Sequence, residues 1–189
     1  VGLIPFYMER IRLPHLPPLG RFSTFPETNV RTYIVDQRGR RGVWFMSLDV
    51  TRLATALVAR ASYNLPYCWA SMNIERDADT VTYRSDRRWP RSTARSLLTV
   101  RAGERVAPAD VSDLEHFVTA RWALGSTLFG QPTWAEVDHV PWPLHRAEIV
   151  ECDESVLAAA GLPTPRGEPF ALWSPGVEVR IGLPRRVRP

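Results

Sequence analysis

The sequence predicts an α+β domain, built on a largely antiparallel sheet that is curled or closed, with two or three helices laid on it. Three observations support this fold class. Most of the chain consists of short runs rich in β-branched and aromatic residues, only a few segments have helical spacing or helix caps, and turn residues separate neighbouring runs. The prediction treats residues 1–189 as a single domain, and we expect a further segment to precede Val1.

The first half of the chain opens with strands. Residues 1–12 alternate or run apolar, as a strand does. Residues 24–36 alternate cleanly, and the glycine-containing stretch 37–42 leads into the apolar run 43–49. This pattern is typical of a β-hairpin.

A helix is expected over residues 52–62, capped by Asp49 or Thr51 and ended by Asn64-Leu65-Pro66. Its apolar residues recur at helical spacing and predict a core-facing side: Leu53, Ala56, Leu57 and Ala61. A second hairpin follows, with strands over 67–76 and 80–86.

The second half continues with a strand over residues 94–101 and a helix over 110–120. Asp110 or Ser112 can cap this helix, and Ser112 with Glu115 forms a capping-box pattern. Further elements are expected as strands over 133–140, 144–151 and 177–181 and as a short helix over 153–161.

The composition of the chain excludes several classes of function. All 24 positive charges are arginine and none is lysine, and the net charge is +4. Arginine clusters such as 84–88 are interspersed with acidic residues and come without a recognition-helix or RNA-binding signature, so nucleic-acid binding is not expected. Cys68 and Cys152 lie far apart, which indicates neither a disulfide framework nor a zinc site. No apolar run approaches membrane-spanning length, and we expect a cytoplasmic protein.

Strand alternation groups the candidate site residues. Glu27, Asn29, Arg31 and Tyr33 share one face of their strand. That face either meets water, as on an ordinary half-exposed sheet, or lines a cavity in which Glu27 and Arg31 support each other. By the same test, Tyr67 and Trp69 point to the face opposite Cys68.

Several stretches, in this order, closely resemble the YqjF-like family of uncharacterised bacterial proteins, which belongs to the acetoacetate decarboxylase-like superfamily. The stretches are VGLIPFYM at 1–8, FPETNVRTY at 25–33, VWFMSLD at 43–49, ARASYNLPYCWASM at 59–72 and VPWPL at 140–144. The resemblance implies a cone-like β-barrel around a hydrophobic cavity, in which the decarboxylases carry out Schiff-base chemistry.

The comparison with that superfamily also bears on chemistry. Decarboxylases carry a Gly-Phe-Pro-Lys-Lys stretch whose paired lysines leave one amine neutral and able to attack a ketone. Residues 64–68 of this chain, Asn-Leu-Pro-Tyr-Cys, match those positions, so Tyr67 and Cys68 stand where the lysines would. Without lysine no side chain can form the imine, which excludes acetoacetate decarboxylation by that route. Glu27 resembles the superfamily's active-site glutamate.

Three functions stay open at this point: a small-molecule-binding protein, an enzyme that uses Glu27 as acid or base beside Tyr67, and a structural protein that forms homo-oligomers. We favour the first, with an anionic or oxygen-rich ligand and with no cofactor, nucleic acid or membrane as partner. Its expected ligand-binding residues are Glu27, Asn29, Arg31, Tyr33, Tyr67, Cys68 and Trp69.

Two other chemistries are not favoured. Cys68 has no sequence neighbour that would lower its pKa and activate it as a nucleophile. No metal is expected, because Asp138, His139 and His145 show no recognised ligand spacing.

Overall fold

The computed structural model of the chain describes residues 1–9, 24–90 and 94–187. The strands and helices of the first half are β1 (Gly2–Met8), β2 (Phe25–Val35), β3 (Arg41–Val50), α1 (Leu53–Tyr63), β4 (Tyr67–Asp77) and β5 (Thr80–Trp89). Those of the second half are β6 (Arg95–Arg105), α2 (Asp113–Thr119), β7 (Ala123–Leu128), β8 (Gln131–Asp138), β9 (His145–Glu154), α3 (Val156–Ala159), β10 (Leu172–Trp173), β11 (Arg180–Ile181) and β12 (Arg185–Arg186). A 3-10 turn covers Pro108–Asp110.

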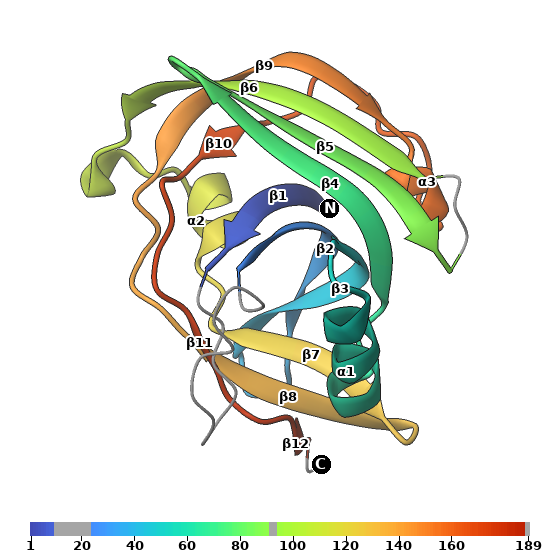
Figure 1. The fold of residues 1–189 in the computed structure, drawn as a ribbon. Coiled ribbons are helices and arrows are strands. Elements are labelled where there is room, and N and C mark those ends of the chain that lie inside the picture. The colour runs from blue at the N-terminus through green and yellow to red at the C-terminus, as the bar shows by residue number, and fades with distance from the viewer. Residues whose placement is uncertain (10–23, 91–93, 188–189) are drawn as a thin grey trace.

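The described strands form one strongly curved sheet, and the predicted fold class is confirmed in its curled form (Figure 1). Its main path runs β10-β9-β6-β5-β4-β3-β7-β8-β11, and β1 and β2 extend it sideways from β3. Among the pairings of the described residues, β3 is parallel to β4 and to β7, and the others are antiparallel. The two ends of the path do not pair with each other, so within the described residues the sheet is open.

Strand β3 is the junction of this sheet. One of its edges pairs with β2 along most of its length. Its other edge pairs with β7 at Val43 and Trp44 and with β4 from Leu48 to Val50. The parallel step from β3 to β4 passes through α1, as a parallel connection requires a crossover. β3 thus lies between β2 and the start of β4, and it brings them within one strand of each other although about 40 residues separate them along the chain.

The core consists of several apolar clusters on both sides of β2 and β3. On one side, Val50 and Phe25 pack with Ala56 of α1. On the other side, Val30 packs with Ala94 and with Val156 of α3. Because both faces are covered, every side chain from Glu27 to Val30 is buried. The polar row of β2 therefore does not meet water at this end.

The helix α1 ends as predicted but faces the core differently. Asn64 is its C-cap in the left-handed conformation, at φ 51°. Its N-cap position is Arg52, without a side-chain cap hydrogen bond, so the predicted caps Asp49 and Thr51 are wrong. Asp49 is unavailable because it is the buried ninth residue of β3.

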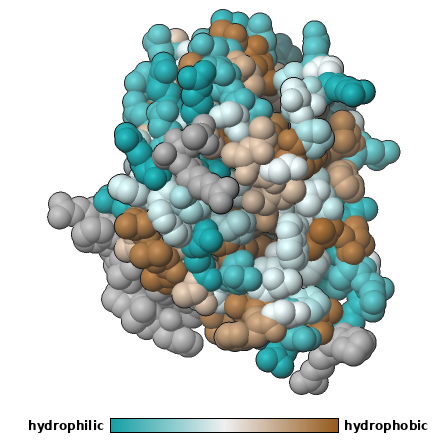
Figure 2. Space-filling view, turned by 90° about the vertical axis from the view of Figure 1, so that its right-hand side faces the viewer, coloured by the Kyte–Doolittle hydropathy of each residue, from teal (hydrophilic) through white to brown (hydrophobic). Residues whose placement is uncertain are grey.

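The predicted apolar face of α1 is also wrong. Ala56 is the buried residue of the helix, whereas Leu53, Leu57 and Ala61 are exposed, Leu57 by 49%. Figure 2 looks onto the side of the molecule that carries α1, where apolar and polar surface alternate. Ala56 packs against Phe25 and Val50, and Tyr63, the last residue of the helix, packs against the cluster that contains Leu48.

The remaining elements agree with the sequence pattern with few exceptions. The helix α2 begins at the predicted capping box, in which Ser112 and Glu115 satisfy each other's backbone amides. Strand β7 was not predicted, because its short sequence ALGSTL lacks alternation. Of the strand expected over 177–181 only Arg180–Ile181 forms. Within the described residues no helix combines the length and apolarity needed to cross a membrane.

Candidate functional site

The centre of the candidate site is a contact between Glu27 of β2 and Tyr67 at the start of β4. The Tyr67 hydroxyl donates a hydrogen bond to Oε2 of Glu27 over 3.2 Å. The sheet register explains the contact, since Glu27 pairs with Val50 of β3 and Tyr67 pairs with Leu48, two residues before Val50 on the same face. The expectation that Glu27 and Tyr67 face the same side is confirmed.

Burial controls the electrostatics of this pair. Glu27 is 3% exposed, and desolvation raises its pKa from 4.5 to about 7, although hydrogen bonds from the Tyr67 and Asn29 side chains act in the opposite direction. Burial, followed by the neighbouring Glu27 charge, raises the pKa of Tyr67 well above its usual value. Around neutral pH the Glu27 carboxyl group is therefore present in both its protonated and its ionised form, whereas the Tyr67 phenol stays protonated.

Asn29 extends the polar row inward from Glu27. Its side chain is buried, and its Oδ1 has no hydrogen-bond partner in the part of the chain that the structure describes. A buried amide oxygen without a partner costs about 1–3 kcal/mol. Such atoms are uncommon in native proteins and mark places where a further group can bind.

The predicted interaction between Glu27 and Arg31, directly or through one partner, does not take its direct form. No hydrogen bond or ion pair joins the two side chains in the described residues, and Nε of Arg31 has no hydrogen-bond partner there. The guanidinium of Arg31 lies instead over the ring of Tyr33, 5.8 Å from its centroid. Four residues of extended chain separate the two positions by about 13 Å. Glu27 is stabilised by protonation and by Tyr67, so its burial does not require the arginine.

Tyr33 lies at the far end of the same row, away from Tyr67. Its ring packs edge-on against Phe117 of α2, with centroids 5.4 Å apart. The row on β2 thus connects two environments: the Glu27 carboxyl with the Tyr67 hydroxyl at one end, and Arg31 with Tyr33 beside α2 at the other.

Cys68 points to the opposite face of β4, as the alternation of a strand demands. There it lies beside a buried ion pair in which Arg87 of β5 contacts Asp49 of β3 over 2.8 Å. Burial raises the pKa of the Cys68 thiol. A raised pKa disfavours the thiolate, which agrees with the expectation that Cys68 is not a nucleophile.

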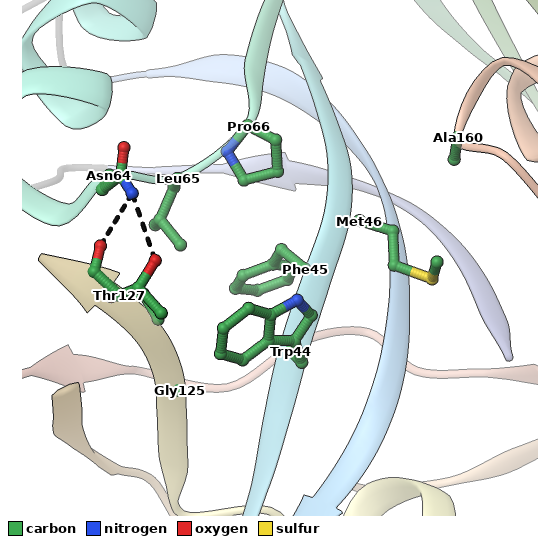
Figure 3. A pocket seen from close by; sticks show the side chains of 10 residues that line it. Trp44, Phe45, Met46, Asn64, Leu65, Pro66, Gly125, Thr127 and Ala160 are labelled. Atoms are coloured by element: carbon green, nitrogen blue, oxygen red, sulfur yellow. Dashed lines mark hydrogen bonds between the residues drawn. The ribbon is translucent and has the colours of Figure 1, made fainter. Parts of the chain in front are cut away.

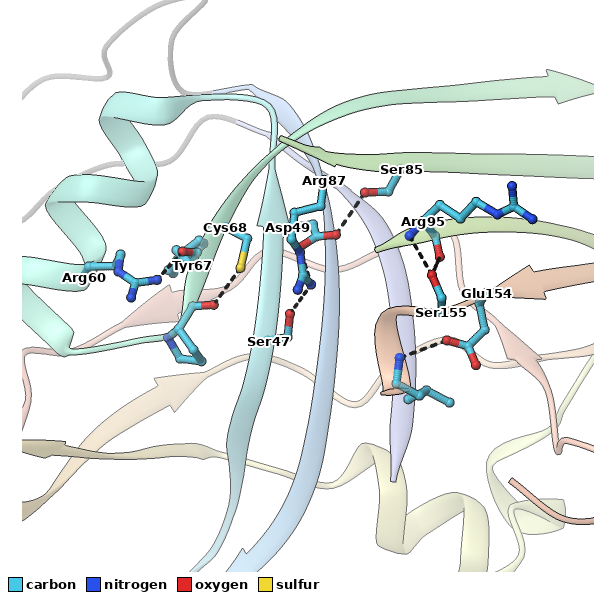
Figure 4. Close-up of polar contacts among 12 residues, drawn as sticks. Ser47, Asp49, Arg60, Tyr67, Cys68, Ser85, Arg87, Arg95, Glu154 and Ser155 are labelled. Carbon is cyan, nitrogen blue, oxygen red and sulfur yellow. Dashed lines mark hydrogen bonds and ion pairs between the residues drawn. The ribbon is translucent and has the colours of Figure 1, made fainter. Parts of the chain in front are cut away.

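The Asp49–Arg87 pair is completed by two serines (Figure 4). Ser85 donates to Oδ2 of Asp49 over 3.1 Å, and Arg87 donates to the Ser47 hydroxyl over 2.6 Å. This network was missed from the sequence, where Asp49 was interpreted as a helix cap. The signal that could have revealed it is an acidic residue inside the apolar strand 43–50.

Two surface pockets lie near the candidate site, but neither is lined by Glu27 or Tyr67. The first has a volume of about 310 Å³ and lies between β3, β7 and the 64–66 connection (Figure 3). Asn64 borders it and donates to the carbonyl oxygen of Thr127 over 2.7 Å. The second, of about 390 Å³, is lined in part by the exposed Trp69 and by Arg88. Tyr67 is not among the residues that line this second pocket.

His139 and His145 contact backbone carbonyls. The Nε2 of His139 lies 3.0 Å from the carbonyl oxygen of Arg121, and Nδ1 of His145 lies 3.0 Å from that of Gly103. Among the described residues, no group of three or more His, Cys, Asp or Glu side chains is arranged to hold a metal ion.

Several solved structures are similar to this chain, although they share little sequence identity with it. The chain is similar to an acetoacetate decarboxylase from Legionella pneumophila, with 13% identity and a TM-score of 0.49, over 98% of this chain and 83% of that one. It is also similar to an acetoacetate decarboxylase-like enzyme from Sphingomonas wittichii RW1, with 14% identity and a TM-score of 0.47, over 88% and 69% of the two chains.

Comparison of sequences places the chain in a family. It is 30% identical over 170 residues to the uncharacterized protein YqjF of Bacillus subtilis (strain 168), which covers 90% of this chain and 69% of YqjF. A family model named DUF2071 and described as an uncharacterized conserved protein matches residues 1–178. The chain therefore belongs to the DUF2071 family, and the resemblance to YqjF-like proteins that its sequence suggested is confirmed.

Proposed function

We propose that the chain binds a small oxygen-rich molecule at the polar row of β2, and that it does so without forming an imine. The observation that carries the proposal is the buried contact between Glu27 and Tyr67, at the place where the resemblance expects Schiff-base chemistry. A carboxyl group with a pKa of about 7 can donate a hydrogen bond to a carbonyl or hydroxyl oxygen when protonated.

The partnerless Oδ1 of Asn29 supports the same proposal, because it supplies a buried acceptor beside the Glu27 donor. Arg31 and Tyr33 supply a cation and an aromatic ring at the other end of the row. A ligand that spans the row therefore carries a neutral oxygen at one end and an acidic group at the other. In this proposal Cys68, on the opposite face of β4, and Trp69, two residues beyond Tyr67, do not contact the bound oxygen.

An acid–base enzyme is the second candidate, favoured by the pKa of Glu27. A general acid or base is most effective when its pKa lies near the working pH, and the pKa of Glu27 is about 7. Since perturbed carboxyl groups also occur in sites that only bind, exchange of a ligand's carbon-bound protons in D₂O distinguishes the two functions.

The test is a thermal-shift panel of small hydroxy acids and keto acids that includes acetoacetate. We expect at least one member to raise the melting temperature of the wild-type protein and to have little effect on Tyr67→Phe, which lacks the hydroxyl beside Glu27. Acetoacetate with borohydride is expected to leave no reduced adduct on any side chain and to release no more CO₂ than buffer does, because the chain has no lysine.

Exposed Tyr7 on β1 offers a matched control, and Tyr7→Phe is expected to respond to the panel as the wild type does. The proposal is contradicted if no member of the panel shifts the wild type, or if Tyr67→Phe and Tyr7→Phe respond alike. A side-chain adduct, located by peptide mapping, would overturn the claim that no imine forms.

A further inference from the structure

Three arginines gather at the end of the β2 row that lies beside α2. Arg31 belongs to β2, Arg41 is the first residue of β3, and Arg121 follows α2. The hairpin register pairs Arg41 with Val35, which lies on the same face of β2 as Arg31. Three segments distant in sequence thus direct positive charge to one place.

Arg121 is the most deeply buried of the three, with 4% exposure. Its Nε donates to the carbonyl oxygen of Phe117 over 2.6 Å, and its guanidinium lies 4.1 Å from the centroid of the Phe117 ring and 5.0 Å from that of Tyr33. These contacts fix the plane of the guanidinium. Its Nη2 is buried and has no hydrogen-bond partner, and the same is true of Nε of Arg31.

The charges of this cluster are not neutralised within the described part of the chain. The ion pairs found there involve other arginines, and Arg41 instead donates to Nδ1 of His116 over 3.4 Å. Residues 10–23, 91–93 and 188–189 contain no Asp or Glu, so their side chains offer no carboxylate either.

The guanidinium groups of Arg31, Arg41 and Arg121 therefore repel one another without a carboxylate among the described residues to offset the repulsion. Burial, with the nearby charges of Arg41 and Arg31, lowers the pKa of the Arg121 guanidinium. A buried cation without a counter-ion is unfavourable, and an anion with oxygen acceptors would remove both the repulsion and the unmet hydrogen bonds.

We propose that Arg31, Arg41 and Arg121 form a binding site for an oxyanion, the carboxylate or phosphate group of a small molecule. The proposal rests on the proposed function in one respect: Arg31 and Tyr33 belong to both, so the cluster would take the acidic end of the ligand. The planar guanidinium groups suit either oxyanion, because each presents parallel N–H donors to two oxygens.

The test is isothermal titration of inorganic phosphate and, separately, of malonate into the 189-residue chain at constant ionic strength set with chloride. We expect saturable binding of at least one of them to the wild type. Arg41→Gln and Arg121→Gln are each expected to weaken that binding about tenfold or more, the effect of losing a charged hydrogen-bond donor. Arg84→Gln removes one exposed charge from β5, away from the cluster, and is expected to change the affinity less than about twofold.

The two probes identify the acidic group that the cluster binds. Binding of phosphate alone identifies a phosphate site, and binding of malonate alone identifies a carboxylate site. If Arg121→Gln does not fold, the exposed Arg41 decides the result. The proposal is overturned if neither anion binds saturably, or if Arg41→Gln binds as tightly as Arg84→Gln. That failure would leave the Glu27–Tyr67 proposal standing, because its panel and its variants are different.

Discussion

Replacing Asp49 by Asn is expected to destabilise the protein by about 3–5 kcal/mol, since the change leaves the charge of Arg87 buried without a partner. Asp49 is 1% exposed and Arg87 is 7% exposed. The neutral amide keeps the shape of the carboxylate, so the loss measures the charge interaction. Urea denaturation, with the slope compared between variants, gives the free energy of unfolding.

The pair itself is not a net source of stability. Taking two charges out of water is costly, and their attraction in the protein interior offsets that cost only in part. Replacing both charges together, as Asp49→Leu with Arg87→Met, is therefore expected to cost less than Asp49→Asn alone.

An exposed ion pair serves as the control for this prediction. Arg95 and Asp153 also lie 2.8 Å apart, but both side chains are more than half exposed. Asp153→Asn is expected to cost less than about 1 kcal/mol. Equal losses in Asp49→Asn and Asp153→Asn would show that burial of the Asp49–Arg87 pair contributes nothing to its energetics.

Replacing Glu27 by Gln is expected to change how stability depends on pH. The pKa of Glu27 in the folded protein, about 7, lies above its ordinary value of 4.5, so the folded state binds the proton more tightly than the unfolded state. The wild type therefore loses about 3 kcal/mol of stability from this group as pH rises from about 4.5 to above 7. Gln does not titrate, so Glu27→Gln lacks this loss.

The measurement is the free energy of unfolding of both proteins between pH 4 and pH 8. The difference between them is expected to be small at pH 4 and to grow in favour of Glu27→Gln by about 3 kcal/mol at pH 8. Glu104, exposed on β6, provides the control, and Glu104→Gln is expected to differ from the wild type by a nearly constant amount. A constant difference for Glu27→Gln as well would refute the raised pKa.

Much of the β-structure could be predicted from the sequence, because alternation and turn residues act locally. The hairpin of β2 and β3, the hairpin of β4 and β5, and the capping box of α2 formed as the pattern indicated. Parity along β2 and β4 also placed Glu27 and Tyr67 on one side, which their hydrogen bond confirms. Placing the two strands next to the same site also required the resemblance to the YqjF-like family, because alternation within one strand does not show which strands are close to each other.

The interactions missed from the sequence depend on which strands become neighbours. Asp49 and Arg87 meet because β3 pairs with β4 and β4 pairs with β5, which no local pattern reveals. Arg121 reaches Tyr33 only because α2 packs against β2. The face of α1 was misassigned, since Ala56 is buried while the larger Leu53 and Leu57 are exposed.

The central claim, that burial beside Tyr67 raises the pKa of Glu27 to about 7, is tested most directly by carbon-13 NMR of the glutamate side-chain carboxyl groups. The Glu27 resonance, assigned by its absence in Glu27→Gln, is expected to titrate with a midpoint of about 7. In Tyr67→Phe the midpoint is expected to move higher, because the Tyr67 hydrogen bond favours the carboxylate. A midpoint near 4.5 in the wild type, unchanged in Tyr67→Phe, would contradict the account.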